Sequence, residues 1–343
     1  MSDDQSKAKL DDVARVAGVS LATASRALST PDLVKSATLL RVREAARLLG
    51  YVAHGAARAL ASRRTHTIGA VIPTLDNPIF ANSTQALQRA LGEQGYQLLL
   101  GSHEYDSGRE VQVTRALLER SVDGLVLVGT DHSPELYQLL LGSKIPYVLT
   151  WSLDESGHHD CVGFNNREAA ARVAQYLYGL GHREFAVISG LTAHNDRARD
   201  RITGVRETLA AQGINLAPQL VVETSFSVQS GREALRAVTR TVPCPTAVIC
   251  GNDVLAQGAM IEALALGIAV PRTLSITGFD DMELSAQTPP GLTTVRIPAA
   301  EIGLRAAMHI LARLNGEVVA QRTELEVKLI VRGSTAPLLY SGV

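Results

Sequence analysis

The hydrophobic positions follow two different patterns along the chain. Up to about residue 62, apolar residues recur at helical spacing and no strand is expected. Leu39, Val42 and Ala46, for example, lie on one face of the third of three short predicted helices. From Ile68 onward, short dense apolar runs alternate with helical stretches, which is typical of a parallel sheet with helical crossover connections.

The apolar runs predict the strands of this second region. They cover residues 68–72, 97–100, 124–128, 147–149, 185–188, 220–222, 247–250 and 274–278. Their number exceeds one ordinary sheet and their spacing leaves room for right-handed crossovers, so we expect two doubly wound lobes. Ligands of such sheets bind at the carboxyl ends of the strands, which predicts a small-molecule cleft between the lobes.

Composition and charge change this picture in one respect. The 343 residues are 46% hydrophobic, which excludes a disordered chain, and the net charge is only −1. Residues 1–66, however, carry 11 basic and 6 acidic side chains, a net charge of +5, whereas the remainder carries −6. A basic head on an acidic body predicts an anionic partner for the head alone.

The cysteines and the N-terminal residues predict the compartment. Cys161, Cys244 and Cys250 have no C-x-x-C spacing, which indicates neither a disulfide framework nor a zinc site. The polar first ten residues lack the apolar segment of a secretion signal, and no apolar run approaches the roughly 20 residues that span a bilayer. We therefore expect a cytoplasmic protein with no membrane partner and no cofactor.

Residues 11–20 carry the signal of a helix-turn-helix. Gly18 can take the left-handed conformation that ends a first helix, and Ser20 is a natural N-cap for a second helix over residues 20–29. Arg26 on that helix can pair with guanine in the major groove, whereas hydroxyl groups suit phosphates. An ordinary helical hairpin with a solvated Arg26 is the alternative. The candidate DNA-contacting residues of this helix are Ser20, Leu21, Ala22, Thr23, Ser25, Arg26 and Ser29.

The sequence LDDVARVAGVSLATASRAL at residues 10–28 resembles the DNA-binding head of the lactose/galactose repressor family of bacterial transcriptional regulators. The sequence AARAL at residues 56–60 looks like that family's hinge helix. The resemblance implies that Ala57, Arg58 and Leu60 meet DNA, with Leu60 wedged into the minor groove. The family's usual Tyr-x-Pro-Asn is YVAH at residues 51–54 here, so the hinge N-cap has to come from His54 or is missing.

The resemblance continues through the rest of the chain. Motifs in the family's order are RSVDGLVLVG (120–129), LGHR (180–183), RITG (201–204), CGND (250–253), GFDD (278–281) and PPGLTTV (289–295). They imply a regulatory core similar to periplasmic sugar-binding proteins, in which a small effector lies between two lobes. The implied effector-binding residues are Asn77, Ile79, Phe80, Trp151, Arg201, Phe226, Asn252 and Asp280.

The chemistry of these implied residues is coherent. Aromatic faces such as Phe226 and Trp151 suit stacking on a sugar or base, and Arg201, Asn252 and Asp280 supply donors and acceptors for hydroxyls or a carboxylate. Each has a structural alternative: Asp280 or Asn252 as a helix cap, and Phe226 as a core residue.

A charged run, HNDRARDR at residues 194–201, brings two further arginines close to Arg201. They indicate either an acidic effector, such as a sugar acid or sugar phosphate, or a solvated lattice with Asp196 and Asp200.

Enzyme and metal motifs are weak. The sequence contains no G-x-S-x-G, no P-loop and no strand-linked G-x-G-x-x-G. The HHDC sequence at residues 158–161 suggests metal ligation, but no second cluster completes a ligand set, so a solvated loop entering a strand is favoured.

The expected fold is a small all-α helix-turn-helix head plus hinge helix, joined to a two-lobed α/β core of doubly wound parallel sheets. The expected boundaries are residues 1–53 for the head, 54–66 for the hinge and linker, 67–164 plus 296–327 for the N-terminal lobe, and 165–295 plus 328–343 for the C-terminal lobe.

The function expected is that of a non-enzymatic transcriptional regulator, a repressor, that acts in the cytoplasm and on the nucleoid when DNA-bound. We expect a homodimer on palindromic operator DNA, with a tetramer as the alternative, and a sugar or sugar acid as effector. A periplasmic-type solute-binding protein and an enzyme of sugar or nucleoside metabolism are the rival functions.

Overall fold

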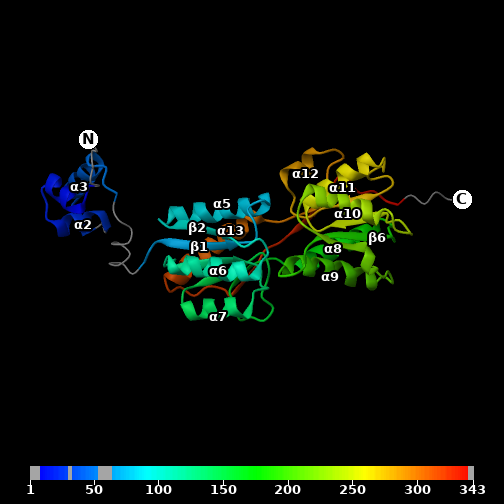
Figure 1. Ribbon diagram of the computed structural model, residues 1–343, viewed down its shortest axis with the longest axis horizontal. Coiled ribbons are helices and arrows are strands. Elements are labelled where there is room, and N and C mark those ends of the chain that lie inside the picture. The colour runs from blue at the N-terminus through cyan, green and yellow to red at the C-terminus, as the bar shows by residue number, and fades with distance from the viewer. Residues whose placement is uncertain (1–7, 30–32, 53–63, 339–343) are drawn as a thin grey trace. The chain divides into compact units, whose positions relative to one another are not determined.

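The computed structural model describes residues 8–29, 33–52 and 64–338, and the chain divides into two units, Met1–His66 and Thr67–Val343 (Figure 1). In the described part of the first unit, the helices are α1 (Leu10–Ala17), α2 (Leu21–Ser29) and α3 (Ser36–Leu48). None of the described helices is long and apolar enough to cross a membrane.

The turn between α1 and α2 forms as the sequence predicts. Gly18 has a φ of 63°, the left-handed conformation, and ends α1. The Ser20 hydroxyl accepts a hydrogen bond from the Thr23 amide at 3.2 Å, so it caps α2. Small side chains, such as Ala14, Ala24 and Ala45, let the three helices approach closely around Val42. The few buried residues of this core determine which face of α2 points outward.

A six-stranded parallel sheet forms the first lobe of the second unit. Its order is β11-β5-β4-β3-β1-β2, with helices α5 and α13 on one face and α6 and α7 on the other (Figure 1). The strands are β1 (Thr67–Ile72), β2 (Gln97–Ser102), β3 (Gly124–Val128), β4 (Tyr147–Thr150), β5 (Cys161–Gly163) and β11 (Arg322–Glu324), and the helices are α5 (Pro78–Glu93), α6 (Ser107–Glu119), α7 (Pro134–Ser143) and α13 (Ala299–Leu314).

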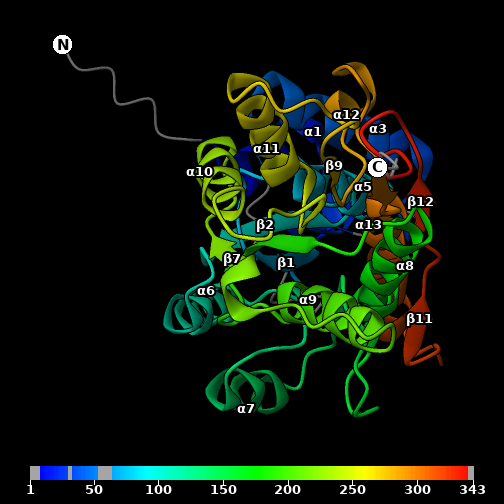
Figure 2. The ribbon, with the colours of Figure 1, turned by 90° about the vertical axis from the view of Figure 1, so that its right-hand side faces the viewer.

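A four-stranded parallel sheet of order β7-β6-β8-β9 forms the second lobe. Helices α8 and α9 cover one face and α10 and α11 the other, which Figure 2 shows from the end of this lobe. The strands are β6 (Phe185–Gly190), β7 (Val221–Thr224), β8 (Ala247–Cys250) and β9 (Ser275–Thr277), and the helices are α8 (Asn166–Gly179), α9 (Asp196–Ala210), α10 (Val228–Val238), α11 (Asp253–Ala265) and the short α12 (Glu283–Gln287), with a 3-10 turn over Pro218–Leu220.

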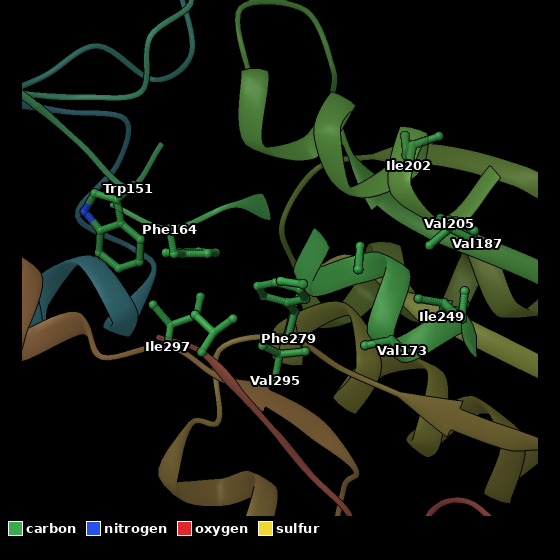
Figure 3. Packing of buried hydrophobic residues seen from close by; sticks show 14 of the residues in the cluster. Trp151, Phe164, Val173, Val187, Ile202, Val205, Ile249, Phe279, Val295 and Ile297 are labelled. Atoms are coloured by element: carbon green, nitrogen blue, oxygen red, sulfur yellow. The ribbon is translucent and has the colours of Figure 1, made fainter. Parts of the chain in front are cut away.

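The two lobes share one hydrophobic cluster. An antiparallel pair, β10 (Thr294–Arg296) and β12 (Lys328–Ile330), lies where the chain crosses between the lobes. Close by, the Phe164 and Phe279 rings are 6.3 Å apart, and Figure 3 shows them between Trp151 and the second-lobe residues of the same cluster. This continuous packing fixes the position of the carboxyl ends of the strands, and the loops that follow them line the cleft.

The fold class predicted from the sequence is confirmed. All eight predicted strands are present, and their ends differ from the prediction by at most two residues. The sequence pattern did not predict β5, β10, β11 and β12 as strands. Each contains three residues, too few to show a periodicity of its own.

Candidate functional site

The outward face of α2 carries most of the predicted DNA-contacting residues. Ser20, Leu21, Ala22, Ser25 and Arg26 are exposed, whereas Ala24 and Ala27 of the same helix are buried in the core. Thr23 differs from the expectation because it is only partly exposed: its hydroxyl lies 2.8 Å from that of Ser20. Ser29 ends the helix, and its side chain lies outside the described residues. The helix therefore presents a basic, hydroxyl-rich face.

The predicted hinge residues Ala57, Arg58 and Leu60, with His54, lie outside the described residues.

One cavity in the second unit brings together all the residues predicted for the effector. Its volume is about 30 Å³, so in this arrangement the two walls lie close together. Its wall includes Asn77, Ile79, Phe80, Trp151, Arg201, Phe226, Asn252 and Asp280. They come from six segments that follow strands of the two sheets at their carboxyl ends, which is where ligands of parallel sheets bind.

The two lobes supply different chemistry to this cavity. The first lobe contributes mainly apolar and aromatic groups, for example the Phe80 and Trp151 rings, which meet edge to face at 4.9 Å. The second lobe contributes most of the polar groups, among them Arg201, Asn252 and Asp280. A ligand in the cavity meets an apolar wall on one side and hydrogen-bonding groups on the other.

Arg201 is held rigidly at the base of the polar wall. Its Nε donates to Asn166 Oδ1 at 2.9 Å and its Nη1 to the Gly251 carbonyl at 2.6 Å, while the guanidinium stacks 3.7 Å from the Phe279 ring centroid. Burial lowers the pKa of Arg201 to about 10 although the nearby Asp280 carboxyl opposes this effect, so the group stays cationic at neutral pH.

Asn166 extends this arrangement to the other lobe. Its Nδ2 donates to the Trp151 carbonyl at 2.9 Å, so one buried amide orients both an arginine and the backbone of the tryptophan. Trp151 itself has a φ of 72°, and Asp280 one of 122°. Strained backbone at two cavity residues is a feature of sites in which position matters more than local stability.

Three buried polar atoms in the cavity wall have no hydrogen-bond partner within the described residues: Ser189 Oγ, Asn252 Nδ2 and Asp280 Oδ2. Asn252 also caps α11, because its Oδ1 accepts from the Leu255 amide at 2.9 Å, so the capping and cavity interpretations hold together. Burial raises the pKa of Asp280 well above its usual range, with Arg201 acting in the opposite direction. Buried polar groups are nearly always paired, so these atoms point to a ligand.

A polar contact joins the lobes beside the cavity. The backbone amide and hydroxyl of Thr130, after β3, both donate to Asp196 Oδ2 at 2.8 Å, and Arg197 Nη1 donates to Asp196 Oδ1 at 2.6 Å. Burial alone would raise the pKa of Asp196, but Arg197 and hydrogen bonds from Ser152 and Thr130 outweigh it and lower the pKa to about 2. We call this contact between Thr130 and Asp196 the latch.

The charged run at residues 194–201 separates in the structure. Arg197 is buried and lines the cavity, whereas Arg199 is exposed and pairs with Asp131 at 2.6 Å. An added Cβ at Gly129 would lie 2.2 Å from Arg197 Nη1, so glycine there makes room for this guanidinium. One of the two extra arginines therefore reaches the cavity, and the other belongs to the surface.

The wall also contains residues that were not among the predicted effector-binding residues, which are Tyr105, Ser189, Gly190, Asn195, Arg197, Ala198 and Gly251. Ser189, Gly190 and Asn195 lie at or just after the end of β6, so the rule that ligands bind at strand ends includes them. Tyr105 lies in the polar loop HEYD at residues 103–106, which follows β2 and was not among the predicted effector-binding segments. Its ring lies 5.6 Å from that of Phe226, across the cleft.

The side chains of the HHDC sequence at residues 158–161 make contacts within the first lobe. Tyr147 and His159 share a 2.6 Å hydrogen bond, and Asp160 pairs with His309 and Arg313 of α13, each at 2.8 Å. Within the described residues, no group of three or more His, Cys, Asp or Glu side chains has the arrangement of a metal site.

Comparison with known proteins agrees with this geometry. Residues 9–54 match the family described as bacterial regulatory proteins, lacI family, and residues 174–335 match the periplasmic binding protein-like domain. The HTH-type transcriptional regulator GntR of Pseudomonas aeruginosa is 35% identical over 328 residues, which cover 95% of each chain. The HTH-type transcriptional repressor CytR of Escherichia coli is 32% identical over 97% of this chain and 98% of that protein.

Solved structures extend the similarity to the fold. A LacI family regulator from Silicibacter pomeroyi, 29% identical, aligns with a TM-score of 0.88 over 96% of this chain and 99% of its own. The regulator CelR in complex with cellobiose, also 29% identical, aligns with a TM-score of 0.71 over 95% of this chain and 99% of its own. The chain belongs to the lacI family of bacterial regulatory proteins and is a DNA-binding transcriptional regulator.

Proposed function

We propose that the protein is a repressor whose affinity for a palindromic operator is controlled by a small effector bound in the interlobe cavity. The observation that carries this proposal is the set of unpartnered buried atoms on Ser189, Asn252 and Asp280, which face one cavity. A ligand with several hydroxyl groups would satisfy them. The complex of CelR with cellobiose supports a sugar-like ligand, since that relative's structure contains a sugar.

The effector carries an acidic group in this proposal. Arg197 and Arg201 both line the cavity, and Asp196 balances only the first of them. Burial favours the neutral form of Asp280, because it raises the pKa of that carboxyl despite Arg201. Arg197 has the Asp196 carboxylate as its direct ion-pair partner and Arg201 has none within the described residues, so a carboxylate or phosphate on the ligand would pair with Arg201.

Calorimetry with a neutral sugar and its sugar acid tests the charge preference. We expect the acid to bind at least about tenfold more tightly, which corresponds to one charge-assisted hydrogen bond. Arg197→Gln should remove most of the preference, whereas Arg199→Gln, the matched control on the surface, should keep it. Equal binding of the two sugars would reject the acidic effector without affecting the proposal of a cavity ligand.

The exposed face of α2 reads the operator in this proposal. Arg26 pairs with a base, and the hydroxyls of Ser20 and Ser25 contact phosphates. Arg26→Ala should then weaken binding to the preferred operator by about tenfold or more and relax its sequence preference. Thr23→Ala should weaken all DNA sequences alike. The reverse pattern in a mobility-shift assay would contradict this assignment of the helix.

The hinge residues Ala57, Arg58 and Leu60 add a minor-groove contact, with Leu60 as the wedge. Leu60→Ala should weaken operator binding far more than non-specific binding, and equal losses would refute the wedge.

We propose a homodimer, because one helix-turn-helix contacts one half-site and two-fold pairing matches a palindrome. Sedimentation on and off DNA tests this, with a tetramer as the contradicting result.

The proposed lobe boundaries are 67–164 plus 296–327 and 165–295 plus 328–343. The membership of β11 in the first sheet and of β6–β9 in the second supports them.

The cavity binds its ligand without chemical change in this proposal, and the protein acts in the cytoplasm and on the nucleoid. Full-length similarity to transcriptional regulators supports both statements. A thermal-shift screen of sugars, sugar acids and nucleobases identifies the effector, since a ligand at about 100 times its Kd adds about 2.7 kcal/mol of stability. A hit that is turned over, or cell fractionation that finds the protein in the periplasm, would contradict the proposal.

A further inference from the structure

Three buried titratable side chains lie together in the first lobe, beyond the cavity wall. His103 follows β2, Glu110 lies on α6, and His132 follows β3; their side chains are 5%, 5% and 2% exposed. One carboxylate oxygen, Glu110 Oε1, lies 3.6 Å from His103 Nε2 and 3.0 Å from His132 Nδ1. We call these residues the His–Glu–His cluster.

The cluster is not a satisfied hydrogen-bond network. Both ring nitrogens of His103 have no hydrogen-bond partner within the described part of the chain, and His132 Nδ1 is within ion-pair distance of Glu110 Oε1 but without the geometry of a hydrogen bond. Buried polar groups are rarely left in this state unless they serve a further purpose. One proton shared between the carboxylate and an imidazole gives a neutral set, whereas a second proton adds a buried positive charge.

Each histidine is close to a residue that contacts the other lobe. On one side, the His103 ring is 6.2 Å from the Tyr105 ring, which in turn lies 5.6 Å from that of Phe226 in the second lobe. On the other side, His132 Nε2 lies 3.1 Å from the Gly129 carbonyl, at the start of the loop that carries Thr130 of the latch. The cluster therefore lies beneath both interlobe contacts.

The charges that face the cluster change when the lobes separate. From the first lobe, the groups that face it are Glu110 of α6, Asp106 at the N-cap of α6, and the phenols of Tyr105 and Tyr137. From the second lobe, the Arg197 guanidinium acts on His103, and Asp196 holds that guanidinium at 2.6 Å. Because Arg197 and Asp196 both belong to α9 of the second lobe, a separation of the lobes would take this pair away from His103 and would expose the loops that carry Tyr105 and His132 to water.

We propose that the His–Glu–His cluster is a proton-sensitive control of the cleft: uptake of a proton by His103 favours the open arrangement of the lobes, and its release favours the closed one.

The direction of the effect follows from the environment of His103 in the closed arrangement. Burial lowers the pKa of His103; Glu110 opposes this shift, and Arg197 and His132 reinforce it. A group whose pKa is lowered in one state favours that state when it is deprotonated, so closure is favoured at neutral pH and lost as the pH falls below about 6.5. One proton changes the ratio of closed to open forms by at most about tenfold per pH unit.

The single tryptophan of the chain provides the measurement. Trp151 lines the cavity and is 3% exposed, so opening of the cleft exposes it. Acrylamide quenching of its fluorescence, in the full-length protein without ligand, should be at least about twofold stronger near pH 5.5 than near pH 7.5. The far-ultraviolet circular dichroism should not change over this range.

Three variants distinguish the cluster from general acid effects. His103→Gln should abolish the pH dependence of quenching. Glu110→Gln removes the group that opposes the downward shift, so it should move the transition to lower pH. His182→Gln is the matched control: His182 is also buried, but its ring bonds Thr246 and Ser275 at 3.0 Å each, within the second lobe, so the wild-type pH dependence should remain.

Quenching that does not depend on pH would overturn the proposal, as would an unchanged pH dependence in His103→Gln. An increase that occurs only together with loss of circular dichroism would also overturn it, because acid would then be unfolding the protein. The experiment uses no effector, so its result is independent of whether the proposed ligand class is correct.

Discussion

The two walls of the interlobe cavity differ in how they can recognise a ligand. The first-lobe wall is largely aromatic and apolar, with Phe80 and Trp151 in edge-to-face contact, whereas the second-lobe wall carries Arg201, Asn252 and Asp280. Apolar contact depends on area and little on direction, while hydrogen bonds in a buried site depend strongly on partner and geometry. For the proposed effector, we therefore expect the second lobe to select the ligand and the first lobe to add apolar contact area.

Arg201→Ala should have the largest effect. Its guanidinium is fixed by Asn166, Gly251 and the Phe279 ring, so nothing else replaces it. We expect about a hundredfold weaker effector binding by calorimetry, corresponding to a lost hydrogen bond to a charged group, and loss of the effector response on DNA. Operator affinity without effector should be nearly unchanged. An intact response would remove Arg201 from the selecting wall.

Asp196→Asn should have the next largest effect, because it alters the latch between the walls. The pKa of Asp196 is lowered to about 2, so its carboxylate stabilises the native protein above about pH 4, and this contribution is lost as the pH falls toward 2. Denaturant unfolding at neutral pH should show about 2 kcal/mol less stability in the variant.

Asp200→Asn is the matched control on the same helix. Burial, followed by Asp196, raises the pKa of Asp200, so a neutral amide should be tolerated there without loss of stability. Equal destabilisation by the two substitutions would show that the charge on Asp196 is not what holds the lobes.

Trp151→Phe should have a smaller effect, of a different kind. It keeps an aromatic ring against Phe80 but reduces the apolar area of the first-lobe wall. We expect binding of every sugar or sugar acid that occupies the cavity to weaken by a similar factor, no more than about tenfold. A changed order of preference among ligands, measured by calorimetry, would contradict the division of roles between the walls.

Asp280→Asn should have the smallest effect. Because burial raises the pKa of Asp280 well above its usual range, the amide imitates the neutral carboxyl in shape and acceptor oxygen. About a threefold loss of affinity is expected, whereas Asp280→Leu should lose substantially more, since it leaves no polar group for the ligand. Similar losses in both variants would show that the ligand requires the charged carboxylate.

The sequence was sufficient to predict those elements that depend only on residues close together in the chain. Gly18 and Ser20 mark the turn between α1 and α2 because a left-handed residue and an N-cap are local requirements. The long apolar runs gave the central strands for the same reason. The short strands β10 and β12 were not predictable, because each is a strand only through its pairing with the other.

The cavity is formed by residues that are far apart in the sequence, so local patterns could not group them. Family motifs identified residues such as Arg201 and Asp280, which the structure brings together, although nothing in their local sequence shows that they meet. Arg197 and Arg199 are two residues apart in one charged run, and only the tertiary structure decides that the first lines the cavity while the second pairs with Asp131 at the surface.

The sequence by itself determined the helix-turn-helix head, the α/β class of the core and the family, since these depend on local spacing and on short motifs. The tertiary structure decided which polar groups are buried without partners, which carboxyl groups are driven toward or away from their charged forms, and how His103, Glu110 and His132 meet. The physical reason is that burial and electrostatic environment depend on groups supplied by distant segments and by the opposite lobe, and no local pattern records those neighbours.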